Sequence, residues 1–417
     1  MAVTQQLSPA YPQPSRLDER GVLEIGGCDA LELAREFGTP AYVVSEDDLR
    51  GRARAMLAAY GARAERFEVV FASKAFPCTA VYRVFAEEGL GCDVASGGEL
   101  AMALAAGFDP ARIYFHGNAK SVGELRAALD ARVGTIVVDN GDEIARLEAL
   151  LGGRTQRVLL RVTPDVRGET HAAISTGQAD SKFGVSMADA PAAIARLQAA
   201  PGLDLAGLHF HIGSQLLDVV PYLRAVAAVA ELGDFPIVNV GGGLGAAYTD
   251  ERPPSIEEYV AAKVDAVQAH LGLDRVIVDE PGRALVANST VTLYTVQSVK
   301  RNVSTWVGVD GGMSDNLRPM LYGARYEVQV ADRFGGDVLC HVAGKHCESG
   351  DVIARDVMLD DPRPGDVLVT PATGAYGHAL ANNYNGVPRP PVVFVKDGDA
   401  RLVVRRETSE DLLARDV

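Results

Sequence analysis

Residues 67–74 read FEVVFASK, a run of β-forming residues that ends on a lysine. Seven similar runs follow, each succeeded by a polar or glycine-rich turn and then by a segment rich in Ala, Leu and Glu. These runs are LGCDVAS (90–96), RIYFHG (112–117), TIVVDN (135–140), RVLLRVT (157–163), LAGLHFHIG (205–213), IVNVGGG (237–243) and RVIVDEPG (275–282). The alternation predicts parallel strands joined by crossover helices.

The spacing of these runs is regular. The first five end at steps of 22, 21, 22 and 22 residues, near Lys74, Ser96, Gly117, Asp139 and Arg161. Eight such β-α units close a barrel, so we predict a (β/α)8 barrel over residues 46–288. An open, doubly wound sheet is the alternative, because it differs only in the order of its strands.

The sequence changes character after about Asn288. Helical segments give way to short β-forming runs separated by Gly, Pro and Asp, which predicts an all-β domain over residues 289–417. Strand-like pieces in residues 21–45 are expected to add to that domain. The Pro-containing residues 1–20 are predicted to be a flexible arm.

Composition narrows the functional class. The chain has 417 residues and a net charge of −15, which disfavours nucleic acid and anionic membranes as partners because both attract basic surfaces. Its five cysteines include no C-x-x-C pair, and the chain does not open with a basic segment followed by an apolar run. No run of about 18 apolar residues is present. We therefore expect a cytoplasmic protein in a reducing compartment.

The polar residues at the ends of the predicted strands form a candidate active site, because barrel enzymes build theirs at the carboxyl ends of the strands. They are Lys74, Asp93, His116, Arg161, His209, His211, Ser214, Gly241, Gly242, Gly243, Glu280, Pro281, Gly282 and Arg283. Lys74 follows the apolar run VVFAS. A desolvated lysine has a lowered pKa and becomes an amine nucleophile able to form a Schiff base. The alternative is a lysine that extends to solvent.

Two turns favour a phosphate-bearing, heteroaromatic cofactor. The glycines 241–243 let backbone N–H groups approach an anion, and barrels often bind phosphate after strands 7 and 8. Glu280 at the end of strand 8 could face a ring nitrogen and keep it protonated, although a local ion pair with Arg283 is the simpler interpretation. His209 and His211 share a face of one strand, as either a metal-binding pair or a cofactor-stacking ring beside a packed one.

The predicted β domain contributes candidates of its own. The motif GKHCESGD places Cys347 and Glu348 beside His346 and Lys345, which could lower the pKa of the thiol. Arg318, Tyr322 and Tyr376 lie in two further motifs. Each of these residues could equally belong to an ordinary turn or interface.

Ten motifs, in order, resemble those of the diaminopimelate decarboxylases, which are alanine-racemase-like, fold-type III pyridoxal 5'-phosphate enzymes. The resemblance runs from about Val22 to about Glu407 through FASKAF, CDVASGGEL, FHGNAKS, RVTPDVRGETHAAISTGQADSKFGV, LHFHIGSQ, VGGGLG, EPGR, DGGMSDNLRPMLYGARYEV, GKHCESGD and GAYGHALANNYNG. It implies a barrel with a C-terminal β domain and decarboxylation of meso-2,6-diaminopimelate to L-lysine. No metal is implied.

The resemblance also implies roles for individual residues. Lys74 would carry the cofactor as a Schiff base, His211 would stack on its ring, and Glu280 would pair with the ring nitrogen. The phosphate would be held by Ser214, Gly243, Gly282 and Tyr376, with Gly242, Pro281 and Arg283 also at the cofactor. Asp93 and Arg161 would lie near Lys74.

The same resemblance implies the substrate contacts and a homodimer. Arg283, Arg318 and Tyr322, with Tyr376, would bind the substrate and its distal carboxylate. Glu348 would bind the distal ammonium, and Cys347 would protonate the carbanion after CO2 leaves. Cys347 and Glu348 would reach the active site of the other subunit.

The alternative functions are a sister amino-acid decarboxylase, a non-catalytic pyridoxal-phosphate carrier and a metal-dependent hydrolase using His209 and His211.

Overall fold

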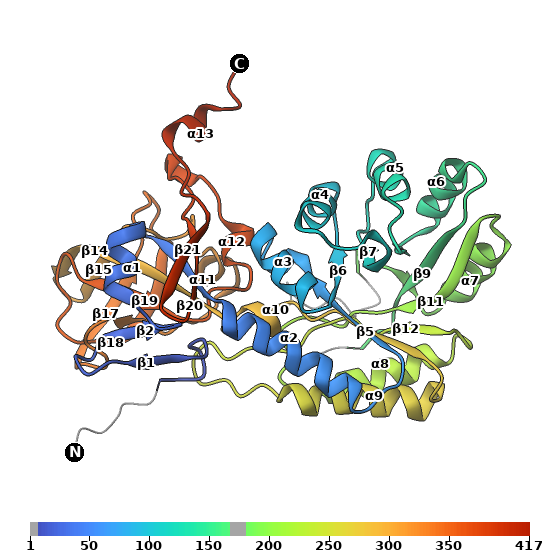
Figure 1. The fold of residues 1–417 in the computed structure, drawn as a ribbon, viewed down its shortest axis with the longest axis horizontal. Coiled ribbons are helices and arrows are strands. Elements are labelled where there is room, and N and C mark those ends of the chain that lie inside the picture. The colour runs from blue at the N-terminus through green and yellow to red at the C-terminus, as the bar shows by residue number, and fades with distance from the viewer. Residues whose placement is uncertain (1–6, 167–180) are drawn as a thin grey trace. The chain divides into compact units, whose positions relative to one another are not determined.

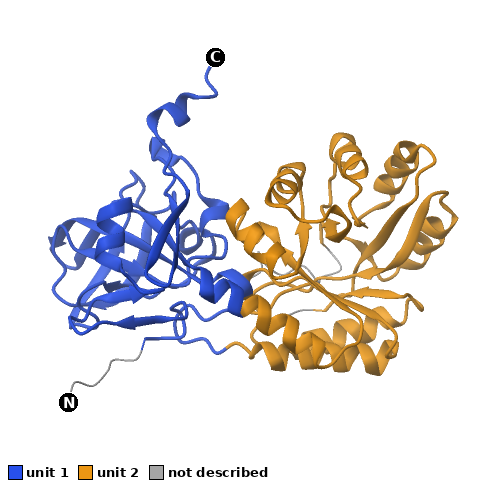
Figure 2. Ribbon diagram, in the orientation of Figure 1, with its two compact units in different colours: residues 1–51, 246–252, 285–417 blue, residues 52–245, 253–284 orange. Residues whose placement is uncertain are grey.

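A computed structural model of the chain describes residues 7–166 and 181–417 (Figure 1). The chain divides into two compact units (Figure 2). The β unit comprises Met1–Gly51, Ala246–Arg252 and Leu285–Val417, and the barrel unit comprises Arg52–Gly245 and Pro253–Ala284. Part of the motif that begins at Arg161 falls in residues 167–180, outside the described residues.

The barrel unit is built on eight parallel strands. They are β5 (Phe67–Ala72), β6 (Gly91–Val94), β7 (Ile113–Phe115), β8 (Thr135–Val138), β9 (Gln156–Thr163), β11 (Leu203–His209), β12 (Ile237–Asn239) and β13 (Val276–Asp279). β8 pairs with β9 and β13 pairs with β5, so the ring of strands is closed. The predicted (β/α)8 barrel is confirmed, and the open doubly wound sheet is wrong. A short β10 (Val185–Ser186) pairs with β9.

Helices connect the barrel strands, as the Ala/Leu/Glu-rich segments predicted. They are α3 (Thr79–Glu87), α4 (Gly97–Ala106), α5 (Val122–Ala131), α6 (Gly141–Leu151), α7 (Ala190–Ala199), α8 (Val220–Ala230) and α9 (Ile256–Leu271). Local signals fix where several of them begin: Ser121 with Glu124, and Ser255 with Glu258, form capping boxes. α2 (Glu46–Gly61) precedes β5, and α10 (Arg283–Val286) follows β13.

Apolar side chains fill the barrel interior. One buried cluster takes a residue from each of six strands, namely Val70, Tyr114, Val137, Leu159, Ile237 and Val278. The interior is therefore a packed core rather than a pore, as in other barrels of this size. This leaves the strand ends as the place where polar side chains can gather.

The β unit holds one large mixed sheet. Its strands run in the order β18 (Val352–Leu359), β17 (Val338–Ala343), β15 (Thr305–Val309), β14 (Thr290–Arg301), β4 (Ala41–Ser45), β20 (Val392–Lys396) and β21 (Asp399–Val404). β19 (Val367–Thr370) pairs with β14 and with β16 (Gln329–Val330). β4 pairs with β14 and β20, so residues before the barrel complete a sheet formed by residues after it.

Short helices interrupt the β unit, and those after Asn288 lie where the sequence predicted none. They are α1 (Ala30–Phe37), α11 (Arg318–Tyr322), α12 (Gly377–Leu380) and α13 (Ser409–Leu413), with a 3-10 turn at Tyr384–Gly386. Further 3-10 turns at Ser73–Ala75 and Pro110–Arg112 belong to the barrel unit. The three helices after Asn288 have at most five residues. Segments of that length carry too few positions to show a helical period.

Residues 7–20 of the predicted flexible arm are instead packed, and residues 1–6 of it lie outside the described residues. β1 (Ser15–Leu17) pairs with β2 (Leu23–Ile25), which pairs with β3 (Cys28–Asp29). Tyr11 is only 2% exposed, and its ring lies 5.8 Å from that of Phe334. A three-residue strand shows no alternation in sequence, so the long-range partner that orders it could not be predicted.

All five cysteines are free thiols, four of them buried and Cys347 exposed. Within residues 7–166 and 181–417, no helix is both long enough and apolar enough to cross a membrane.

Candidate active site

Lys74 lies at the carboxyl end of β5, in the 3-10 turn Ser73–Ala75. Its side chain is exposed, whereas Ser73 and Ala75 on either side are fully buried. The backbone N–H of Ala72 donates to the carbonyl of Pro281, 3.1 Å away, so the strand that carries Lys74 is tied to the turn after β13. An anchored backbone with an exposed amine suits a nucleophile at the barrel mouth.

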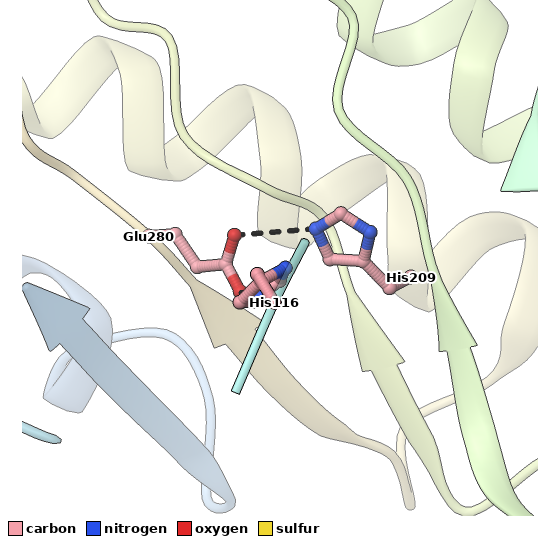
Figure 3. Close-up of side chains that lie close together, drawn as sticks. All are labelled: His116, His209 and Glu280. Atoms are coloured by element: carbon pink, nitrogen blue, oxygen red, sulfur yellow. Dashed lines mark hydrogen bonds and ion pairs between the residues drawn. The ribbon is translucent and has the colours of Figure 1, made fainter. Parts of the chain in front are cut away.

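Glu280, directly after β13, is the centre of a buried polar cluster (Figure 3). Its Oε1 accepts hydrogen bonds from Nδ2 of Asn239 at 2.6 Å and contacts Nε2 of His116 at 2.8 Å. Its Oε2 contacts Nε2 of His209 at 3.2 Å. Three strand ends thus supply partners for one carboxylate.

Electrostatics fix the protonation of this cluster. Burial lowers the pKa of His209 to about 3, so its ring is neutral at pH 7. Its Nε2 must carry the proton in order to donate to Glu280, which leaves Nδ1 as an acceptor with no partner among the described residues. Burial alone would raise the pKa of Glu280, but His116 and His209 hold it well below its usual value. Glu280 is therefore an anion.

His211 and Asp93 complete this side of the mouth. Burial, followed by the positive charges of Lys74 and Arg161, lowers the pKa of His211 well below its usual value. Burial raises the pKa of Asp93 to about 6, against the opposing effect of His116 and Lys74. Of the two predicted neighbours of Lys74, Asp93 therefore interacts with it electrostatically.

Arg161 lies within β9 rather than after it, and it is buried. Its guanidinium carbon lies 4.4 Å from the centre of the Phe183 ring. Burial lowers its pKa, while the carboxylates of Asp139, Glu280 and Asp93 oppose that shift.

The glycine turn after β12 needs its glycines. Gly241 and Gly243 have φ values of +59° and +127°, which side chains rarely allow. A Cβ on Gly242 would lie 2.0 Å from the carbonyl oxygen of Glu280. Among residues 7–166 and 181–417, no protein group accepts from the N–H of Gly242 or Gly243. These two donors can therefore serve an anion.

Gly282 and Arg283, which follow β13, contact residues that follow other strands of the barrel or end them. A Cβ on Gly282 would lie 3.1 Å from Cβ of Ala72 and 3.2 Å from Cβ of Ala75, so only glycine lets this turn approach the backbone around Lys74 so closely. The Arg283 guanidinium donates to Oγ of Ser214 from Nε at 3.3 Å and from a terminal nitrogen at 3.1 Å.

The remaining predicted residues belong to the β unit, where backbone hydrogen bonds join three distant motifs. The N–H of Met313 donates to Asp351 at 2.7 Å, that of Asn382 to the carbonyl of Ser314 at 2.9 Å, and that of Cys347 to Oδ1 of Asn385 at 2.9 Å. The motifs DGGMSDN, GKHCESGD and ANNYNG therefore form one cluster of loops.

Arg318 is held rigidly within the β unit. It is 5% exposed, its guanidinium carbon lies 4.5 Å from the centre of the Tyr248 ring, and a terminal nitrogen donates to Tyr326 Oη. Tyr322, four residues on, is half-buried, and so is Tyr376, whose φ is +62°. Cys347 and Glu348 are both exposed.

Comparison with known proteins identifies this arrangement. The family described as "Pyridoxal-dependent decarboxylase, pyridoxal binding domain" matches residues 46–287. Over 421 residues the chain is 49% identical to the diaminopimelate decarboxylase of Actinosynnema pretiosum subsp. auranticum, covering 98% of this chain and 95% of that protein. The chain belongs to the diaminopimelate decarboxylase family. The predicted resemblance is confirmed.

Other members of the diaminopimelate decarboxylase family agree. The Bacillus subtilis (strain 168) enzyme is 46% identical over 425 residues, covering 97% of both chains. The crystal structure of diaminopimelate decarboxylase from M. jannaschii in co-complex with L-lysine superimposes with a TM-score of 0.91 at 34% identity, covering 97% of this chain and 98% of that one.

The residues at these strand ends fit pyridoxal phosphate, the cofactor of this decarboxylase family. An exposed lysine amine can bind its aldehyde, an anionic glutamate can face its pyridinium nitrogen, and a glycine turn offers N–H groups for its phosphate. The ligand atoms of His116, His209 and Glu280 lie within 4.8 Å of one another, as a metal site would require. Their direct hydrogen bonds already account for that closeness, and the cluster does not include the predicted pair of His209 and His211 as its ligands.

Reasoning from the sequence missed Asn239. It is fully buried, donates to Glu280, and accepts at Oδ1 from the N–H of Gly241 at 3.0 Å. Its side chain therefore joins the carboxylate to the glycine turn. The only available signal was a polar residue inside the apolar run IVNV, which is costly unless its hydrogen bonds are satisfied. His116 was predicted to lie at a strand end in the site, but its contact with Glu280 was not predicted.

Proposed function

We propose that this chain catalyses the decarboxylation of meso-2,6-diaminopimelate to L-lysine and CO2, the last step of lysine biosynthesis by the diaminopimelate pathway. The observation that carries the proposal is 49% identity over 98% of the chain to a diaminopimelate decarboxylase. An exposed Lys74 and an anionic, buried Glu280 on adjacent strand ends support it.

The barrel residues would hold and activate the cofactor. When bound, pyridoxal phosphate supplies an electron sink for the pair left on the α-carbon as CO2 departs. Lys74 would bind its aldehyde carbon, and His211 would lie against its ring. Glu280 would hold a proton at the ring nitrogen. The phosphate ligands would be Ser214, Gly242, Gly243, Gly282 and Tyr376, with Asp93, Pro281 and Arg283 as further contacts.

The β unit would supply substrate contacts. Arg318 and Tyr322, with Arg283, would bind the distal carboxylate, and Tyr376 would contact the substrate. The buried, stacked Arg318 is preorganised for this task, because little side-chain freedom is lost on binding. Glu348 would bind the distal ammonium, and Cys347 Sγ would deliver the proton to the α-carbon.

The assay for this proposal is CO2 release from meso-diaminopimelate by the protein loaded with pyridoxal phosphate. We expect L-lysine and CO2 in equal amounts. L-Ornithine lacks the distal carboxylate and would leave buried cations unpaired, so its kcat/KM should be at least roughly 1,000-fold lower. CO2 release from another amino acid instead of meso-diaminopimelate would indicate a sister decarboxylase. No CO2 release at all would indicate a non-catalytic pyridoxal-phosphate carrier. Activity that needs a metal but no pyridoxal phosphate would indicate a hydrolase.

We extend the proposal to a homodimer in which Cys347 and Glu348 enter the active site of the partner subunit. Both side chains are exposed on the turn between β17 and β18, so they can contact another molecule. The free thiols are consistent with the cytoplasm as the place of the reaction.

Mixing two inactive variants tests the shared site. Lys74→Ala and Cys347→Ala subunits, unfolded together and refolded, should regain up to about a quarter of the wild-type activity, because half of the dimers would be mixed and each would hold one intact site. Each variant refolded alone is the control. If the mixture stays as inactive as the separate variants, each site is built from one chain.

A further inference from the structure

A lysine and an aspartate are buried together behind the glycine turn. Lys263 of α9 and Asp279 of β13 are both 0% exposed, with Nζ and Oδ1 2.9 Å apart. Nζ also donates to the carbonyl of Gly241 at 2.8 Å and to Tyr259 Oη. It lies 4.5 Å from the centre of the Tyr222 ring on α8. Helices α8 and α9 lie side by side (Figure 1).

A buried ion pair is energetically costly in the wall of a barrel. Replacing a buried ion pair with apolar side chains of similar volume is often neutral or stabilising, because desolvation offsets the attraction between the charges. Burial lowers the pKa of Lys263, and Asp279 opposes that shift. The stability of the fold therefore does not by itself explain why Lys263 and Asp279 are paired. The hydrogen bond from Lys263 to the carbonyl of Gly241 indicates that the pair acts on the glycine turn.

The hydrogen bonds to the turn set the direction of its peptide groups. In a planar trans peptide, the C=O of one residue and the N–H of the next point in opposite directions. Lys263 holds the carbonyl of Gly241, and Tyr222 Oη donates to the carbonyl of Gly242 at 3.2 Å. The next N–H groups, those of Gly242 and Gly243, must then point away from the helices.

Asp279 keeps this arrangement fixed. Its Oδ1 accepts from Lys263 at 2.9 Å and from Tyr259 at 3.0 Å, and its Oδ2 accepts from Tyr60 at 2.8 Å. Asp279 and Glu280 are neighbours, and the N–H of Glu280 donates to the carbonyl of Gly241 at 3.2 Å. One carbonyl therefore receives both the lysine and the backbone of the adjacent strand.

We propose that Lys263, held by Asp279 and helped by Tyr222, is a positioning residue that aims the amides of Gly242 and Gly243 at the cofactor phosphate. The proposal rests on the assignment of the phosphate to this turn in the proposed function. It makes the affinity for the phosphate group, rather than for the pyridine ring, depend on side chains that never touch the cofactor.

The decisive quantity is the phosphate selectivity, defined as the dissociation constant of pyridoxal divided by that of pyridoxal phosphate. Both constants come from fluorescence titration of the full-length protein after removal of the cofactor. We expect Lys263→Met with Asp279→Asn to lower this selectivity at least tenfold, mainly by weakening pyridoxal phosphate binding. The double variant leaves no unpaired buried charge, so it is expected to fold.

A second buried pair provides the matched control. Lys120 and Glu143 are 3% and 0% exposed, with Nζ and Oε1 2.6 Å apart, and Nζ also donates to the carbonyls of Gly117 and Val137. Lys120→Met with Glu143→Gln removes the same chemistry from other strand ends. Its phosphate selectivity should stay within about twofold of wild type.

A milder pair of variants keeps the proposal testable if the double variant does not fold. Tyr222→Phe removes one hydroxyl from the turn and should lower the selectivity severalfold. Tyr60→Phe removes a hydroxyl that bonds the other oxygen of the same aspartate, Oδ2, and should not lower the selectivity. Unchanged selectivity in Tyr222→Phe, or equal weakening of both ligands in the double variant, would overturn the proposal. A wild-type selectivity near one would instead refute the phosphate assignment itself.

Discussion

The Lys74→Ala protein should lose decarboxylase activity by more than about 1,000-fold, the scale expected when a covalent catalytic group is removed. Lys74 is the exposed amine at the end of β5, between fully buried neighbours. Alanine leaves the turn intact but removes the nitrogen that would bind the cofactor aldehyde. Borohydride reduction should fix the cofactor to the peptide that contains Lys74 in the wild type, and mass spectrometry should find no such adduct in the variant.

Two variants separate the loss of the amine from the loss of charge. Lys74→Arg keeps a cation but cannot form the covalent link, so it should be as inactive as Lys74→Ala. Lys300→Ala, which changes an exposed lysine at the end of β14, should keep wild-type activity and labelling. Full activity in Lys74→Ala, or an adduct on a different lysine, would contradict the assignment of Lys74.

The barrel could be predicted because its repeating unit is local. In the first half of the barrel, each strand, turn and helix is encoded within about 22 residues, and start signals such as Ser121 with Glu124 lie in the same stretch. The closure of the ring follows from the number of units and needs no long-range detail. The prediction of a flexible arm was wrong for residues 7–20 for the opposite reason. Tyr11 packs against Phe334, which lies more than 300 positions away in the sequence.

In the active site, too, features encoded locally could be predicted, whereas contacts between distant residues could not. Single residues such as Lys74 and Glu280 stand out because a charge follows an apolar run. The partners of Glu280 could not be assigned in this way, because His116, His209 and Asn239 meet only when the register of three strands is known. The buried pair of Lys263 and Asp279 was equally hidden. A lysine on a helix is ordinary in sequence, and only packing shows that it is fully buried.

Glu280→Gln should lower kcat by roughly 100- to 1,000-fold, the effect of removing one preorganised electrostatic group. Glutamine has nearly the same shape but no charge, so it cannot hold a proton at the ring nitrogen. The electron pair left by CO2 would then be poorly stabilised. The absorbance spectrum of the bound cofactor should shift with the loss of that proton, while the affinity for pyridoxal phosphate should change little.

The cluster can accept this glutamine without unfolding, which makes the kinetic result interpretable. The amide oxygen can replace Oε1 as the acceptor for Asn239 and His116. The amide nitrogen would face His209, whose neutral ring can move its proton to Nδ1 and accept at Nε2. Glu68→Gln is the matched control, because Glu68 is a second barrel carboxylate, bonded to Tyr114 at 2.9 Å near the start of β5. If Glu280→Gln decarboxylates as fast as Glu68→Gln, the anion at Glu280 serves the fold alone and the ring nitrogen needs no carboxylate.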